Sequence, residues 1–216
     1  EFRFAPVDAK MIRYGLGAVK GTGENAVTAI VAARESGGPF RDIFDFCNRV
    51  DRRVVNRRAI EALIRAGAFD VLDAERSRVL SQVSLAMETA DQAAANAHQN
   101  SLFGMEDVVP AANARPGSTD AQYPKWSDRQ KLVEEKAALG FFFSSHPFSI
   151  MRDEVRTLCP TPIGKLEAGR DMSIVAGIVT DVRTQMTRRG KMAFVTLDDG
   201  EGRIEATVFS ELFDAQ

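Results

Sequence analysis

The chain has 216 residues, of which 44% are hydrophobic and 27% charged, and its formal net charge is −2. These values are ordinary for a globular protein and allow one or two domains with real hydrophobic cores. A slightly acidic chain does not bind polyanions over its whole surface, so any contact with a nucleic acid must come from a local basic patch. The sequence shows neither a run of about 18 apolar residues nor the layout of a secretory signal, which argues against a membrane-spanning or secreted protein.

The cysteines and histidines give no sign of a metal or catalytic site. Cys47 and Cys159 lie far apart, and neither has His, Cys or acidic residues at metal-ligand spacing. We therefore expect two reduced thiols in a cytoplasmic protein. His98 and His146 also lack partners at ligand spacing, so we expect no metal site and no catalytic histidine.

The first candidate binding element is a glycine-rich segment over residues 15–23. A predicted helix follows from Glu24 to about Glu35, and Gly37-Gly38-Pro39 ends it. A glycine turn between two helical pieces resembles a helix-hairpin-helix motif, in which backbone N–H groups approach a phosphate and the following helix N-terminus is electropositive. A turn with a purely structural role is the alternative. The candidate DNA-binding residues here are Lys20, Gly21, Thr22 and Gly23.

A second, degenerate copy of this motif is predicted over residues 56–70. A short helix around residues 43–50 comes first; Asn56 then caps a helix that ends at Gly67, with the hairpin at Gly67-Ala68-Phe69. Between Arg49 and Arg65 there are six arginines and two acids, a local balance of +4. Guanidinium groups suit phosphate geometry, although a solvated helix face is the alternative. The candidate DNA-binding residues of this segment are Arg52, Arg53, Arg57 and Arg58.

A short peptide motif follows the next predicted helix, which covers residues 76–97 and has its apolar stripe at Leu80, Val83, Met87, Ala90 and Ala94. Residues 99–103 have the Gln-x-x-Leu-Phe form with which bacterial proteins dock on the ring-shaped sliding clamp. The Leu and Phe would fill an apolar pocket, and the Gln amide would hydrogen-bond at its rim. A helix end that packs these two side chains into its own core is the alternative. The candidate clamp-binding residues are Gln99, Ser101, Leu102 and Phe103.

The second half of the chain changes from a helical to a strand-like pattern. Residues 105–125 are rich in Pro, Gly and Ser without a period, which predicts a flexible linker. Ser127 and Gln130 then form a predicted capping box for a helix to about Leu139. After Ser173 the hydrophobic period becomes two, with strand-like runs over 174–182, 192–197 and 203–209 separated by turn signals.

An antiparallel meander of this kind resembles the start of an OB-fold, a small barrel that stacks single-stranded bases on a sheet face rimmed with positive charge. Phe194 is a candidate stacking platform, although we favour a place for it in the barrel core. No acidic pair has a context suited to holding Mg²⁺, and Asp198-Asp199-Gly200 is predicted to form a turn. The candidate single-strand-binding residues are Arg183, Arg188, Arg189 and Lys191.

These elements predict an α+β fold, in which a helical tandem helix-hairpin-helix domain precedes an antiparallel β OB-fold segment that is truncated before the barrel closes. The predicted boundaries are 1–104 for the DNA-binding and clamp-binding region, 105–125 for the linker, 126–165 for a helix and connecting segment, and 166–216 for the N-terminal part of the OB-fold.

Four stretches, taken in order, resemble the C-terminal part of the alpha subunits of bacterial DNA polymerase III, the C-family of replicative DNA polymerases. They are Tyr14 to Gly23, Asn56 to Asp70, Leu139 to Pro147 and Val195 to Ala206, and the resemblance covers essentially the whole chain. It implies tandem helix-hairpin-helix motifs, an internal clamp-binding peptide and an OB domain. It also implies as partners the sliding clamp (the beta subunit), double-stranded and single-stranded DNA, and other replicase subunits.

The resemblance further implies that the parent protein is a DNA-directed DNA polymerase, a nucleotidyltransferase of DNA replication that uses Mg²⁺ and is cytoplasmic and nucleoid-associated. The polymerase aspartates and the phosphoesterase-like domain of that family lie upstream. We therefore expect this chain to bind DNA and the clamp without polymerising nucleotides and without a cofactor of its own. Two alternatives stay open: a helix-hairpin-helix/OB module of a DNA-repair enzyme, and a non-enzymatic nucleic-acid-binding adaptor.

Overall fold

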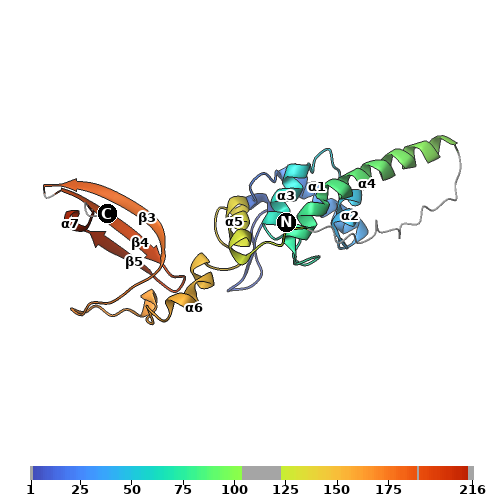
Figure 1. Ribbon diagram of the computed structural model, residues 1–216. Coiled ribbons are helices and arrows are strands. Elements are labelled where there is room, and N and C mark those ends of the chain that lie inside the picture. Colours follow the sequence, from blue (N-terminus) through green and yellow to red (C-terminus); the bar gives the residue numbers. More distant parts are fainter. Residues whose placement is uncertain (1, 104–122, 189, 214–216) are drawn as a thin grey trace. The chain divides into compact units, whose positions relative to one another are not determined.

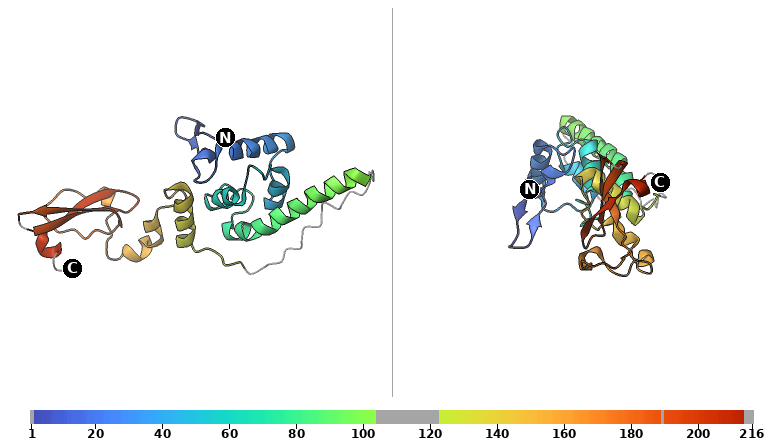
Figure 2. Two further views of the ribbon diagram at one scale, coloured as in Figure 1. Left: turned by 90° about the horizontal axis from the view of Figure 1, so that it is seen from above. Right: turned by 90° about the vertical axis from the view of Figure 1, so that its left-hand side faces the viewer.

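A computed structural model describes residues 2–103, 123–188 and 190–213, and for residues 97–103 it describes the backbone alone. The chain divides into two compact units, Glu1–Phe141 and Phe142–Gln216, which we call the helical unit and the sheet unit (Figures 1 and 2). Among the described residues, no helix is long and apolar enough to cross a membrane. Within the same residues, no three His, Cys, Asp or Glu side chains gather as a metal ion requires.

The helical unit consists of a small β-hairpin, a 3-10 turn and a series of α-helices. In chain order the elements are β1 (Ala5–Pro6), β2 (Ile12–Arg13), η1 (Leu16–Ala18), α1 (Glu24–Gly37), α2 (Ile43–Arg49), α3 (Arg57–Arg65), α4 (Arg76–Phe103) and α5 (Asp128–Leu139). Helix α4 is longer than the predicted 76–97 helix. Its alanine-rich part continues the helical conformation, as expected from the residue with the highest helix propensity.

The predicted helix ends are confirmed by their hydrogen bonds. The Asn56 side chain accepts a hydrogen bond from the backbone N–H of Ala59 (3.0 Å), and Ser127 Oγ accepts one from the N–H of Gln130 (3.2 Å). The reciprocal bond of the predicted capping box, from the Ser127 N–H to the Gln130 side-chain oxygen, does not form; the Gln130 side chain is directed to Glu134, to whose carboxylate its amide nitrogen donates (2.7 Å). Gly67 adopts a φ of +84° just after α3, a conformation that favours glycine and ends the helix.

The hydrophobic core of the helical unit lies where α4 packs against α2 and α3. On the predicted stripe of α4, Val83 and Ala90 are buried, and they share a cluster with Phe46 of α2 and Leu63 of α3. Full burial of each large side chain contributes about 1.5–3 kcal/mol. Beyond Ala90 the described side chains of α4, residues 91–96, are all exposed. The far end of α4 therefore extends away from the core (Figure 1).

A buried arginine joins the first residue of α4 to two other parts of the helical unit. Arg76 is only 4% exposed. Its guanidinium donates to both carboxylate oxygens of Asp70 (2.8 and 2.7 Å), to the carbonyl oxygen of Arg65 (3.0 Å) and to the carboxylate of Glu135 (3.2 Å). Glu135 lies on α5 and is 0% exposed. Because these contacts hold α5 in the helical unit, the segment expected at residues 126–165 is divided between the two units.

The sheet unit starts with short helical turns and ends with a three-stranded sheet. Its elements are η2 (Pro147–Ile150), α6 (Arg152–Val155), η3 (Ile163–Lys165), β3 (Ile178–Thr187), β4 (Gly190–Asp198), β5 (Arg203–Val208) and α7 (Ser210–Phe213). The strands pair antiparallel in the order β3-β4-β5, which confirms the predicted meander. The first strand begins later than predicted and runs further, because its pairing with β4 continues to Thr187 opposite Gly190.

The predicted turn at Asp198-Asp199-Gly200 also anchors the segment that precedes the sheet. Asp199 Oδ1 accepts hydrogen bonds from the N–H groups of Glu201 and Gly202 (2.8 and 2.7 Å), and Oδ2 accepts one from Ile163 (2.8 Å). Burial alone would raise the pKa of Asp199, but these backbone donors outweigh it and hold the pKa below its usual value. The carboxylate is therefore a structural acceptor in the sheet unit.

Replacing Arg76 with alanine should destabilise the helical unit by at least about 3 kcal/mol, because removing one member of a buried ion pair leaves the other without a partner. The matched control is Arg78→Ala. Its ion pair with Asp73 (2.7 Å) leaves the arginine 44% exposed and should contribute only about 0–1 kcal/mol. Urea unfolding measures both free energies. Equal losses in the two variants would show that the buried network does not hold α4 and α5 together.

Candidate nucleic-acid interface

The first glycine hairpin presents an open stretch of backbone. Gly21 has a φ of +87°, and the N–H of Thr22 donates to the carbonyl of Val19 (3.1 Å) to close the turn. A Cβ added at Gly21 or at Gly23 would meet no atom within 4 Å, so an anion can approach the main chain there. Thr22 differs from its neighbours because it is 6% exposed. Its side chain is therefore buried and not available to a ligand.

The N-terminus of α1 leaves its amide groups without a side-chain acceptor. Asp42, Asn56 and Ser127 cap helices α2, α3 and α5 with side-chain oxygens, whereas the N-cap residue of α1 is Gly23, which offers none. The first N–H groups of a helix have no partner within the helix and carry a partial positive charge. Lys20, three residues before Gly23 in the sequence, is exposed. The hairpin and the start of α1 together therefore form an arrangement suited to a phosphate.

The second hairpin is closed by its own side chains. Gly67 has almost the same φ as Gly21, but a Cβ added to it would lie 2.3 Å from Nη2 of Arg76 and 3.0 Å from Oδ2 of Asp70. The guanidinium thus covers the backbone face that is open at Gly21. The predicted degenerate copy exists as a turn, but a phosphate cannot approach it in the same way.

The arginines between Arg49 and Arg65 are less available than their number suggests. Arg53 is 91% exposed and pairs with Asp51 (3.0 Å), and Arg57 is 60% exposed and pairs with Glu61 (2.7 Å). The hydrogen bond from Arg53 holds the pKa of Asp51 below its usual value, so this acid stays charged. Arg58 is exposed, and it makes no ion pair with any described residue.

Arg52 has a structural use that the sequence did not indicate. Its guanidinium donates to the carbonyl oxygen of Met87 (3.0 Å) and to the carboxylate of Asp91, and its side chain is 20% exposed. Both acceptors lie on α4. Arg52 therefore fixes the segment before α3 to α4, and the exposed cationic surface here reduces to Arg53, Arg57 and Arg58.

The predicted clamp-binding peptide lies at the end of α4. The backbone of residues 99–103 continues the helix, while the side chains of Gln99, Ser101, Leu102 and Phe103 lie outside the described residues. The same holds for most of the predicted linker, residues 104–122. What the structure does describe is the approach to the peptide, an exposed helical stretch beyond the core contact at Ala90.

The sheet has one apolar and one polar face, and Phe194 lies on the polar one. Phe194 is paired with Arg183 on β3 and with Thr207 on β5, so these three side chains share a face. Its neighbour Val195 pairs with Val182 and Ala206, which places the apolar residues on the opposite face because side chains alternate along a strand. The register therefore favours the stacking-platform alternative over the place in the barrel core that we favoured from the sequence.

The predicted basic rim of the sheet is partly neutralised. Arg183 pairs with Asp181 (3.3 Å) and with Glu205, and the Lys191 ammonium lies 5.0 Å from the centre of the Phe213 ring. Arg188 is exposed, whereas Arg189 lies outside the described residues.

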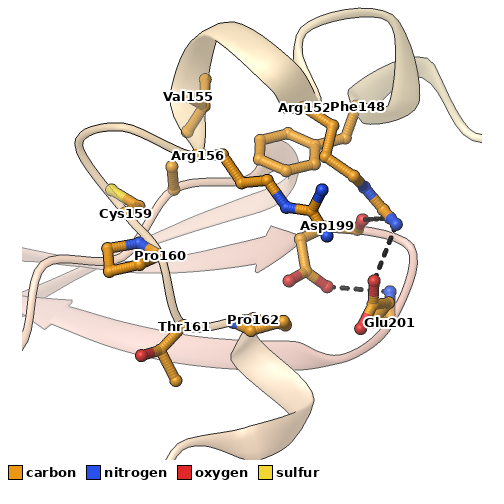
Figure 3. A pocket seen from close by; sticks show the side chains of 11 residues that line it. Phe148, Arg152, Val155, Arg156, Cys159, Pro160, Thr161, Pro162, Asp199 and Glu201 are labelled. Carbon is orange, nitrogen blue, oxygen red and sulfur yellow. Dashed lines mark hydrogen bonds and ion pairs between the residues drawn. The ribbon is translucent and has the colours of Figure 1, made fainter.

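A small pocket separates the turns before the sheet from the β4–β5 turn (Figure 3). Arg152 crosses it and donates to the Glu201 carboxylate (2.7 Å) and the Asp199 carbonyl oxygen (3.1 Å). Phe148 and Cys159 contribute to its wall. Its volume of about 30 Å³ is enough for water but far too small for a nucleotide base. The ion pair, whose side chains are 33% and 40% exposed, therefore links α6 to the β4–β5 turn and leaves no room for a base.

Sequence models of two known families match the chain. A helix-hairpin-helix motif matches residues 1–79, and an OB-fold nucleic acid binding domain matches residues 174–216. The predicted order of a helical helix-hairpin-helix region followed by an OB-fold sheet is thereby confirmed.

Several proteins named DNA polymerase III subunit alpha are similar to the chain over nearly all of its length. The protein from Neisseria meningitidis serogroup B (strain ATCC BAA-335 / MC58) is 48% identical over 209 residues, which cover 96% of this chain and 18% of that protein. The Pseudomonas aeruginosa protein is 39% identical over 234 residues, covering 100% and 20%. The Escherichia coli O6:H1 protein is 32% identical over 226 residues, covering 99% and 19%. The chain thus spans about a fifth of the length of these relatives, and it is a homologue of one segment of DNA polymerase III subunit alpha.

Proposed function

We propose that this chain is the part of a bacterial replicative DNA polymerase that holds DNA through the backbone of its first hairpin. The observation that carries the proposal is the uncapped start of α1 behind an open glycine turn. Backbone N–H groups bind phosphate oxygens without reading bases. A polymerase must move along every sequence, so contact of this kind suits it.

The parent protein would be a DNA-directed DNA polymerase that acts with Mg²⁺ and with other replicase subunits in the cytoplasm. The described residues do not fit the metal, since no three carboxylates, cysteines or histidines gather among them. We therefore assign this chain a binding role and derive no catalytic step from it.

Replacing Gly23 with aspartate should separate binding from folding. Gly23 has a φ of −80°, which any residue adopts, so the new carboxylate can cap α1 and should leave stability equal or higher by a few tenths of a kcal/mol. The same carboxylate would occupy the phosphate site and repel the phosphate groups of DNA. Duplex affinity should fall about tenfold to a hundredfold, the loss of one charge-assisted contact of about 1.5–3 kcal/mol. The log–log salt slope should decrease by about 0.9.

The control is Asn56→Asp, which adds the same charge at the start of α3, where a side-chain cap already exists. Fluorescence anisotropy with a random-sequence duplex and thermal melting of the same samples provide the two measurements. If Gly23→Asp binds the duplex as tightly as the Asn56→Asp control, the first hairpin is not the phosphate contact.

We also propose that the polar face of the sheet contacts single-stranded DNA through Phe194. Its ring shares that face with Arg183 and Thr207, and aromatic rings on such sheets stack with bases.

Phe194→Ala should weaken oligothymidine binding by about 1–3 kcal/mol with little loss of stability. Val195→Ala, on the apolar face, should lower the melting temperature and leave affinity unchanged. The opposite pattern would place Phe194 in the core.

A second proposed role is tethering to the sliding clamp through residues 99–103. The supporting observation is that α4 leaves the core at Ala90 and its side chains stay exposed up to residue 96, the last position before the peptide at which side chains are described. Large apolar side chains that stay uncovered favour aggregation, so a docking role would give Leu102 and Phe103 a purpose.

Replacing Leu102 and Phe103 together with alanine should reduce affinity for the clamp a hundredfold or more. Burial of two such side chains contributes about 3–6 kcal/mol in total, and about 1.4 kcal/mol corresponds to tenfold. Leu85→Ala, at a 44% exposed position of the same helix, is the control and should bind normally. Surface plasmon resonance on immobilised clamp measures affinity. A double variant that binds normally but melts at a much lower temperature would assign these residues to the core.

A further inference from the structure

The residues that flank the first hairpin are held by the end of α5. The N–H of Lys20 donates to the carbonyl oxygen of Ala138 (2.9 Å). The Tyr14 ring lies 5.7 Å from the ring of Phe141, centre to centre. Leu139 belongs to the same hydrophobic cluster as residues on both sides of the hairpin. Residues more than 100 positions later in the chain thus contact the hairpin just before its glycine turn.

From this arrangement we infer that the C-terminal end of α5, residues 138–141, is the positioning element of the phosphate-contacting hairpin. The inference rests on the proposed function of that hairpin. The hydrogen bond from Lys20 fixes the peptide immediately before Gly21, and a glycine is the residue that would otherwise move most freely. The end of α5 therefore determines where the open N–H groups point.

The end of α5 also holds the side chain of Lys20. A Cβ added at Gly140 would lie 3.6 Å from both Cε and Nζ of Lys20, so the ammonium lies beside the last turn of α5. The C-terminus of a helix carries a partial negative charge that attracts cations. The lysine is thereby kept next to the hairpin instead of moving freely in solvent.

Helix α5 is itself fixed on the side of the second hairpin. Glu135 accepts a hydrogen bond from the buried Arg76 (3.2 Å), and Glu134 pairs with Arg65 (3.1 Å). The closed second hairpin thus supports α5, and α5 supports the open first hairpin. This gives the second hairpin a role in DNA binding without a phosphate contact of its own.

Gly140 is the residue at which this support can be altered. It has a φ of +93° and caps α5 in the left-handed conformation, with its N–H donating to the carbonyl oxygen of Lys136 (2.7 Å). The 3.6 Å spacing to Lys20 is an ordinary contact, so a side chain has room. The restriction is conformational: valine is strained at such a φ, while asparagine tolerates it.

The test compares Gly140→Val with Gly140→Asn and with Gly38→Val in the full chain. Gly38 also has a positive φ, +76°, and open space around it, but it lies at the far end of α1. We expect Gly140→Val to weaken duplex binding about tenfold and to speed hydrogen exchange of the Lys20 amide. Gly140→Asn and Gly38→Val should bind as the wild type does.

The Ala68 amide donates to the carbonyl oxygen of Leu63 in the second hairpin (2.9 Å). Its hydrogen-exchange rate reports whether the unit stays folded. If Ala68 also loses protection in Gly140→Val, the milder Gly140→Ala is scored in its place. The inference is wrong if the strained variant exposes the Lys20 amide yet binds DNA normally while Gly23→Asp does not. If Gly23→Asp also binds normally, the proposed function fails first. Equal weakening by Gly38→Val would attribute the effect to general strain and overturn the inference.

Discussion

The arrangement of the helical unit depends on the guanidinium of Arg76. A guanidinium offers five donors in one rigid plane, and Arg76 uses them on Asp70, on the carbonyl of Arg65 and on Glu135. Glu135 follows 59 residues later in the sequence, so this contact, together with the Glu134–Arg65 pair, ties α5 to the end of α3 and the start of α4. Both charges are buried, which makes the pair costly to break from one side.

The two glycine hairpins show how one backbone geometry takes two roles. Gly21 and Gly67 have φ values of +87° and +84°, and sequence alone would treat them as copies. The two hairpins differ in the side chains that lie next to the glycine. An arginine and an aspartate cover Gly67, whereas nothing lies within 4 Å of a Cβ at Gly21. Binding capacity at such a turn therefore depends on which N–H groups remain uncovered, and the turn motif does not determine that.

Local signals in the sequence predicted the elements well, and distant contacts limited the prediction of the site. Asn56, Ser127 and Gly67 mark helix ends because caps and positive φ values act within a few residues. The pairing of Arg52 with α4 and of Arg76 with α5 joins residues far apart in the chain, and no local pattern encodes it. The side of the sheet on which Phe194 lies depends on both local and distant information. Its alternation with Val195 and Leu197 was visible in the sequence, but deciding which face is apolar required the strand register.

The basic segment shows why a count of charges overestimates affinity. Its local balance of +4 comes from six arginines, yet Arg49, Arg52 and Arg65 bond to acceptors within the unit, and Arg53 and Arg57 each pair with an acid. Only a few cations are then left to release counterions from DNA, and each contact contributes about 0.9 to the salt slope. We therefore expect such a surface to bind duplex weakly by itself. In the proposed arrangement, a second attachment through the clamp peptide would raise the effective concentration of the hairpin near DNA, so weak and sequence-independent contacts would suffice and would still allow the protein to slide.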